Sequence, residues 1–128
     1  MDYQIKVLHL QDRGNYLIAL TRGLLDAGGF ERLFRLIKDA SERETNCKIL
    51  IDLADAICHF EPPDIERIVE DLNGDLQTRD HRVALISPAD IGQYDQLSEL
   101  RAGLAVCGLK IAVFTHTKAA ADWLAESP

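Results

Sequence analysis

The chain has 128 residues, the length of one ordinary domain, and its 47% apolar and 27% charged residues are typical of a globular protein. A net charge of −7 without any Lys/Arg cluster argues against a nucleic-acid-binding domain, which should show a basic patch. No apolar run approaches the roughly 18 to 20 residues that a membrane-spanning helix needs, and the first residues do not resemble a secretory signal. We therefore predict a single cytoplasmic domain over residues 1–128.

The first two predicted elements are strands. Residues 3–10 alternate between polar and apolar side chains, and residues 16–23 form a second strand-like stretch. A Gly-Asn turn signal at residues 14–15 separates the two, which favours an antiparallel hairpin.

A helix is predicted next, over residues 26–44, with Asp26 as its N-terminal cap. Four side chains at the spacing i, i+3, i+4, i+7 give this helix one apolar face: Phe30, Leu33, Phe34 and Ile37. The nearly continuous apolar run at residues 47–56 then predicts a strand that is covered on both faces.

The stretch "CHFEPPDIERIV" (residues 58–69) leads from this strand into a second helix. Proline is tolerated in a first helical turn, where the missing N–H has no partner to lose, and Pro62 and Pro63 fit that position. Glu61 and Asp64 suit the positive end of the helix dipole. The predicted apolar face comprises Ile65, Ile68, Val69, Leu72 and Leu76.

The remaining chain repeats the pattern of buried strand and helix. Strands are predicted at residues 82–87 and 109–115, and helices at residues 90–108 and from Thr117, which would cap the closing helix. Six side chains of the third helix can face inward: Ile91, Tyr94, Leu97, Leu100, Leu104 and Cys107. The order ββαβαβαβα predicts an α/β fold with four parallel strands, an antiparallel first strand and four helices.

This order and one segment resemble the STAS domain family (sulfate transporter and anti-sigma-factor antagonist). In "KILIDLADAICHFEPPDIERI" an apolar strand ends in Asp-Leu and is followed by a short loop and a helix start, as in that family. Phe114, Ala119 or Ala120, and the Trp123-Leu124 pair also look like the end of STAS-like proteins. The resemblance covers nearly the whole chain and implies a single STAS-like domain of a bacterial regulatory protein.

One departure from the family removes its regulatory switch. The phosphoswitch members carry a Ser or Thr at the start of the helix after this strand, and a kinase phosphorylates it. The corresponding positions here lie near residues 59–63, and no hydroxyl side chain occurs between Leu53 and Asp75. We therefore expect a divergent member that is not a phosphorylated switch.

The first functional hypothesis is a non-enzymatic regulatory or protein-interaction module. The resemblance implies a partner surface on the loop and helix from residue 60 to 76, with Phe60, Glu61, Asp64 and Arg67 as the contact residues. Phe60 also fits a hydrophobic staple that packs back on the fold. None of the enzyme motifs GxSxG, P-loop, GxGxxG and HExxH occurs in the sequence.

The second hypothesis is a small-molecule site, with or without catalysis, at the carboxyl ends of the parallel strands. Open α/β sheets bind ligands at that edge, where Asp55, Ser87 and His116 are expected. Polar residues at strand ends also commonly cap the next helix, which is the plainer interpretation. A third hypothesis is a homodimer through an edge strand at residues 3–10 or through an exposed Phe60.

We predict neither a metal nor a cofactor. Cys58, His59 and Glu61 are ligand types, but they lie within four residues and have no second pair at a metal-ligand spacing. The three cysteines, Cys47, Cys58 and Cys107, are odd in number and widely spaced, which favours buried thiols over disulfides.

Overall fold

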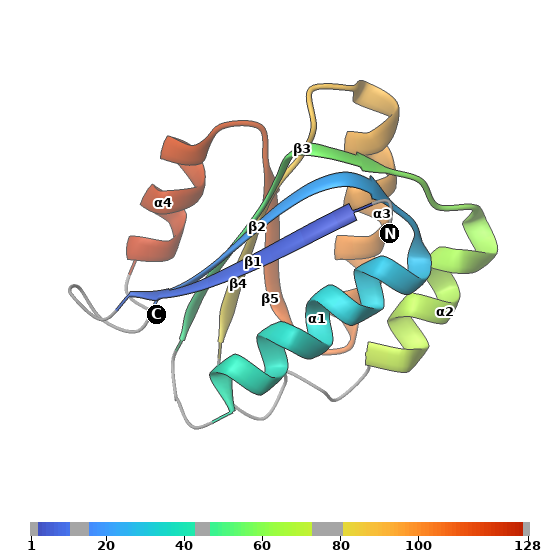
Figure 1. Ribbon diagram of the computed structural model, residues 1–128. Coiled ribbons are helices and arrows are strands. Elements are labelled where there is room, and N and C mark those ends of the chain that lie inside the picture. Colours follow the sequence, from blue (N-terminus) through green and yellow to red (C-terminus); the bar gives the residue numbers. More distant parts are fainter. Residues whose placement is uncertain (1–2, 11–15, 43–46, 73–80, 127–128) are drawn as a thin grey trace.

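The computed structural model describes residues 3–10, 16–42, 47–72 and 81–126, and within them strands and helices follow the predicted order (Figure 1). The elements are β1 (Tyr3–Leu10), β2 (Tyr16–Leu25), α1 (Ala27–Ser41), β3 (Lys48–Cys58), α2 (Pro62–Leu72), β4 (Arg82–Ile86), α3 (Ile91–Val106), β5 (Lys110–Phe114) and α4 (Thr117–Ala125). The predicted turn at residues 14–15 and the predicted helix residue Leu76 lie outside the described part of the chain.

The five strands form one sheet in the order β1-β2-β3-β4-β5. β1 is antiparallel to β2 and the other neighbours are parallel, which confirms the predicted α/β architecture. β2 and β3 each run two residues past their predicted ends, and their pairing shifts register between Leu20 and Arg22. At this bulge the Ala54 N–H donates to Asp52 Oδ1 at 3.0 Å, and β3 continues beyond β4 to Cys58.

Helices cover the two faces of the sheet unequally (Figure 1). α1, α2 and α3 bury the main core against one face, whereas α4 packs on the other face over β4, with Ala120 and Leu124 against Ala84 and Ile86. The main core contains Leu17, Ile49, Ile51, Leu53, Val83 and Leu85 from the strands and Phe30, Leu33, Phe34, Ile37, Ile68, Leu97 and Leu100 from the helices. On the α4 side, Leu20 and Leu24 of β2 and Ile57 of β3 stay exposed. Asp55 is exposed as well, so the prediction that the strand at residues 47–56 is covered on both faces is wrong for its last residues.

The helix ends show which local predictions hold. Asp26 caps α1 as predicted, since the Gly29 N–H donates to its Oδ1 at 2.9 Å. Gly108 follows α3 with φ of 103°, a left-handed conformation that glycine adopts without strain. Thr117, by contrast, is the first helical residue of α4, and the cap position is held by His116 without a side-chain hydrogen bond.

Ile91 corrects the predicted inward face of α3. Its side chain is 78% exposed, whereas Leu97, Leu100 and Leu104 are buried. With about 3.6 residues per turn, Ile91 lies almost on the opposite side of the helix from Leu104, so both cannot face the sheet. No helix in the described part of the chain is long and apolar enough to cross a membrane.

Candidate functional site

The loop before α2 is held by bonds to three parts of the molecule. The Glu61 N–H donates to Asp64 Oδ2 at 2.9 Å, and the Asp64 N–H donates to the Glu61 carbonyl at 2.9 Å, which closes the first turn of the helix. The His59 N–H donates to the Leu25 carbonyl at 3.0 Å, and the Phe60 N–H donates to Gln96 Oε1 at 3.3 Å. The loop is therefore fixed between β2 and α3.

Phe60 is an anchor of this loop and not part of its surface. Its side chain is only 2% exposed, and its ring meets the Phe30 ring edge-on, with centroids 5.4 Å apart and planes at 87°. The prediction that Phe60 contacts a partner or drives a dimer is therefore wrong, because α1 already covers the ring. Phe60 packs back on the fold, as in the alternative prediction of a hydrophobic staple.

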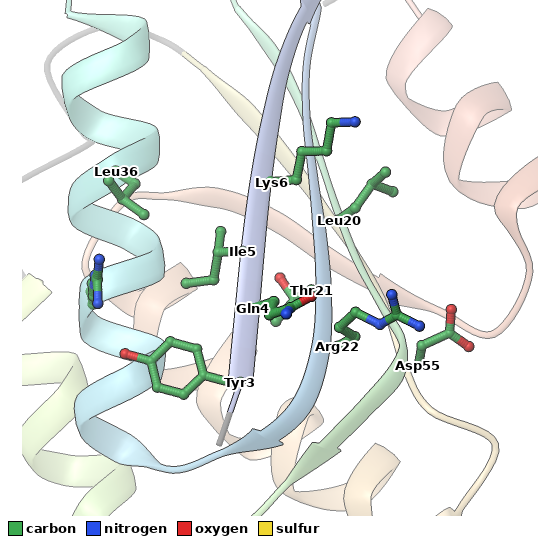
Figure 2. A pocket seen from close by; sticks show the side chains of 10 residues that line it. Tyr3, Gln4, Ile5, Lys6, Leu20, Thr21, Arg22, Leu36 and Asp55 are labelled. Atoms are coloured by element: carbon green, nitrogen blue, oxygen red, sulfur yellow. The ribbon is translucent and has the colours of Figure 1, made fainter. Parts of the chain in front are cut away.

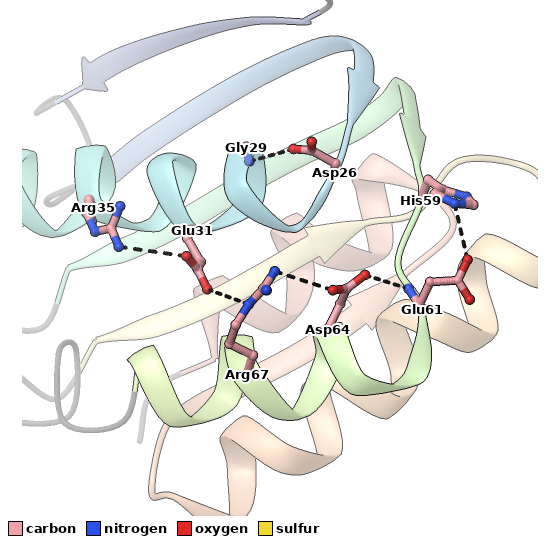
Figure 3. A network of polar contacts seen from close by, with 8 residues as sticks. All are labelled: Asp26, Gly29, Glu31, Arg35, His59, Glu61, Asp64 and Arg67. Carbon is pink, nitrogen blue, oxygen red and sulfur yellow. Dashed lines mark hydrogen bonds and ion pairs between the residues drawn. The ribbon is translucent and has the colours of Figure 1, made fainter.

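Beyond Phe60, the charged residues of α2 join a polar network that reaches α1 (Figure 3). The Arg67 guanidinium lies 3.3 Å from Asp64 Oδ1 and 4.0 Å from Glu31 Oε1, and the other Glu31 oxygen lies 3.8 Å from Arg35. Glu31 is nearly covered, with a side chain 12% exposed, while Arg67 is 57% exposed. We call Glu31, Arg35, Asp64 and Arg67 the α1–α2 network.

Glu31 was missed by the sequence analysis. Burial raises the pKa of its carboxyl, and a hydrogen bond with Asp71 and the Asp71 charge raise it further, while Arg67 and Arg35 act in the opposite direction. The only signal in the sequence is an acid on α1 just after the buried Phe30, which by itself does not indicate a partner on α2.

Of the three predicted strand-end residues, only Asp55 lines the pocket that is described below. Ser87 is buried, and its hydroxyl donates to the Pro88 carbonyl at 2.8 Å. His116 is exposed at the start of α4. Asp55 lies past the β2–β3 bulge, opposite Arg22, and it lines a pocket that contains neither Ser87 nor His116.

This pocket has a volume of about 660 Å³ and lies at the β1 edge of the sheet, on both sides of β1 (Figure 2). Tyr3 and Ile5 point toward α1, which adds Arg32 and Leu36 to the lining. Lys6, Leu20, Arg22 and Asp55 line the side that faces away from α1, and Gln4 and Thr21 complete the lining. We call it the β1-edge pocket.

The residues weighed as metal ligands do not share a site. Cys58 is buried, and burial raises the pKa of its thiol to about 12, so it stays protonated at neutral pH. The side chains of His59 and Glu61 are 68% and 67% exposed, with Nε2 and Oε1 3.5 Å apart. Among the described residues, no group of three or more His, Cys, Asp or Glu side chains is arranged to hold a metal ion.

Comparisons with known proteins identify the fold. No protein-family model matches the chain, and no curated protein matches it. A solved structure does: an uncharacterised protein of the DUF3478 family with a SpoIIAA-like fold, from Shewanella loihica PV-4. It is 20% identical with a TM-score of 0.56, over 96% of this chain and 94% of that one. The chain therefore has a SpoIIAA-like, that is STAS-like, fold, as the sequence predicts.

Proposed function

We propose that this domain is a non-enzymatic regulatory module that binds another protein through the exposed face of α2 and its preceding loop, around Glu61, Asp64 and Arg67. The observation that carries the proposal is the α1–α2 network, which holds Arg67 and Asp64 in place by contacts within α2 and from Glu31 of α1. Side chains that are ordered before binding lose less conformational entropy when a partner arrives.

The charge on this face is the second support for the proposal. Glu61 is exposed beside His59, and no hydroxyl in residues 54–74 could take up a phosphate. Binding would therefore depend on permanent charges, and the partner should carry complementary charge where Glu61 and Arg67 meet it.

The non-enzymatic part of the proposal rests on the strand ends. The Ser87 hydroxyl, the best nucleophile among the predicted strand-end residues, is buried and already donates to a carbonyl. Asp55 lines the β1-edge pocket, which contains neither Ser87 nor His116. A nucleophile needs a base within hydrogen-bonding reach, and these residues do not provide that arrangement.

Affinity purification from cells of the source organism tests the proposal. Glu61→Lys and Arg67→Glu should each lose a partner that the unchanged protein retains, whereas Lys118→Glu, an exposed charge reversal on α4, should keep it. Unfolding midpoints of all variants would show that the fold is intact.

A different result would overturn the proposal. If both α2 variants keep every partner, the α2 face is not the binding surface. If Asp55→Ala or His116→Ala instead abolishes a ligand-induced thermal shift, the small-molecule hypothesis replaces it.

A further inference from the structure

The free edge of β1 is a second surface, distinct from the α2 face. β1 is the first strand of the sheet, and within the described residues it pairs only with β2. Backbone N–H and C=O groups that point away from the paired neighbour of an edge strand are available to a further strand. An extended segment placed here would continue the sheet along the eight residues of β1.

The β1-edge pocket gives such a segment side-chain contacts on both sides. Ile5 and Leu36 provide apolar surface on the α1 side, and Lys6 and Leu20 line the opposite side (Figure 2). Successive side chains of a strand point to opposite faces, so an added strand would fill both halves alternately.

The charges of the pocket indicate what kind of segment fits. On the side that faces away from α1, its lining holds two cations, Lys6 and Arg22, and one acid, Asp55, on a chain whose net charge is −7. A local excess of positive charge on an acidic protein favours a partner with acidic side chains. We propose that the β1 edge binds an extended acidic segment of another protein as a sixth strand, with carboxylates on the side of Lys6 and apolar side chains on the side of Ile5 and Leu36.

A second copy of this chain fits the edge less well. Pairing two β1 edges would bring two copies of Lys6 to one junction, and like charges on facing strands destabilise the pairing. An edge lysine can also serve only to prevent unwanted pairing, so the experiment has to separate that role from recognition.

The test is a titration followed by amide chemical shifts of the whole chain. The probe is a blocked octapeptide of alternating valine and glutamate, and its controls carry lysine for glutamate or proline at two central valines. We expect the glutamate peptide to shift amides of β1, and neither control to do so. Lys6→Glu should weaken binding by about tenfold or more, while Lys118→Glu should leave it unchanged.

Three results would overturn the proposal. These are equal binding of the glutamate and lysine peptides, shifts confined to residues away from β1, and no shift at any peptide concentration. If the Lys6→Thr variant self-associates and the unchanged protein does not bind the peptide, Lys6 serves only to prevent unwanted strand pairing. Because Glu61→Lys does not touch this edge, it should bind the peptide normally, so the two proposals can fail separately.

Discussion

At the scale of single residues, Thr21 has an unusual environment. It lies on the core-facing side of β2 with 3% of its surface exposed, and within the described residues its Oγ1 has no hydrogen-bond partner. A buried hydroxyl without a partner loses its bonds to water and gains none in return. We therefore expect Thr21 to weaken the fold.

Thr21→Val should stabilise the protein because it keeps the branched shape and replaces the hydroxyl by a methyl group. We expect the free energy of unfolding in urea to rise by about 1 kcal/mol. Thr117→Val, at the exposed start of α4, is the matched control and should change it little. A loss of stability in Thr21→Val would mean that the hydroxyl makes a favourable bond.

Glu31 makes a pH-dependent contribution to stability. Burial and Asp71 raise the pKa of Glu31 above its usual 4.5, so the folded protein keeps this proton at a pH where the unfolded chain has lost it. The protonated Glu31 carboxyl stabilises the fold fully below the pKa that it has in the unfolded chain. This stabilisation is lost as pH rises through the pKa that Glu31 has in the folded protein.

Asp71→Asn should therefore reduce this loss, because it removes a charge that disfavours ionised Glu31. Urea unfolding between about pH 4 and pH 8 should show the variant gaining stability relative to the unchanged protein as pH rises. Glu70→Gln, the exposed neighbour on α2, controls for a general change in charge. Parallel curves for all three proteins would contradict the coupling of Glu31 to Asp71.

At the scale of elements, α2 and α3 approach closely at one glycine. A Cβ added at Gly103 of α3 would lie 2.7 Å from Cγ2 of Val69 on α2, which is closer than carbon atoms can pack. Valine is branched at Cβ and has little freedom to move away. The absence of a side chain at this position thus allows the two helices to pack at this distance.

Gly103→Ala should destabilise the fold by about 1–3 kcal/mol, although alanine is the better helix former. Val69→Ala makes room for the new methyl group, so Gly103→Ala should be less harmful, or even favourable, in that background. A double-mutant cycle of urea unfolding energies measures the coupling. Additive effects of the two substitutions would show that they do not touch.

At the scale of the whole molecule, the two helical layers differ in size. β3 and β4 lie inside the sheet, and β4 is covered by the main core on one face and by α4 on the other. β1 lies at the sheet edge, and its Gln4, Lys6 and Leu10 side chains are exposed. Local unfolding of β1 therefore breaks fewer packing contacts than local unfolding of β4.

Native-state hydrogen exchange should follow this arrangement. Amides of β4 and of the paired part of β3 should exchange most slowly, and amides of β1 that face away from β2 should exchange fast. If those β1 amides are as protected as β4 at high protein concentration and lose protection on dilution, two copies pair through β1. That result would also contradict the preference for an acidic segment at this edge.

Much of the fold was predictable because it depends on neighbours in the chain. The spacing of Phe30, Leu33, Phe34 and Ile37 predicted the buried face of α1, and Asp26 predicted its start. The alternation of strands and helices predicted the parallel sheet, since βαβ connections have one preferred hand. Each of these signals is local to a few residues or to one repeated unit.

The site was less predictable because its contacts join distant segments. Phe60 looked like a surface residue until α1 placed Phe30 against it, and Glu31 had no visible link to Arg67. Ser87 and Asp55 both follow apolar runs, yet one is buried and the other lines the β1-edge pocket. Burial in a loop depends on which helix covers it, and periodicity contains no such information.

The sequence alone therefore determined the order of elements, the α/β class of the fold and the absence of a hydroxyl at the start of α2, because these follow from short-range pattern and residue identity. Only the tertiary structure decided that Phe60 is buried, that Glu31 joins α2 and that a pocket lies on both sides of β1. The physical reason is packing: α1, α2 and α3 close one face of the sheet and α4 closes only part of the other. Which polar groups meet at the surface is set by that layering.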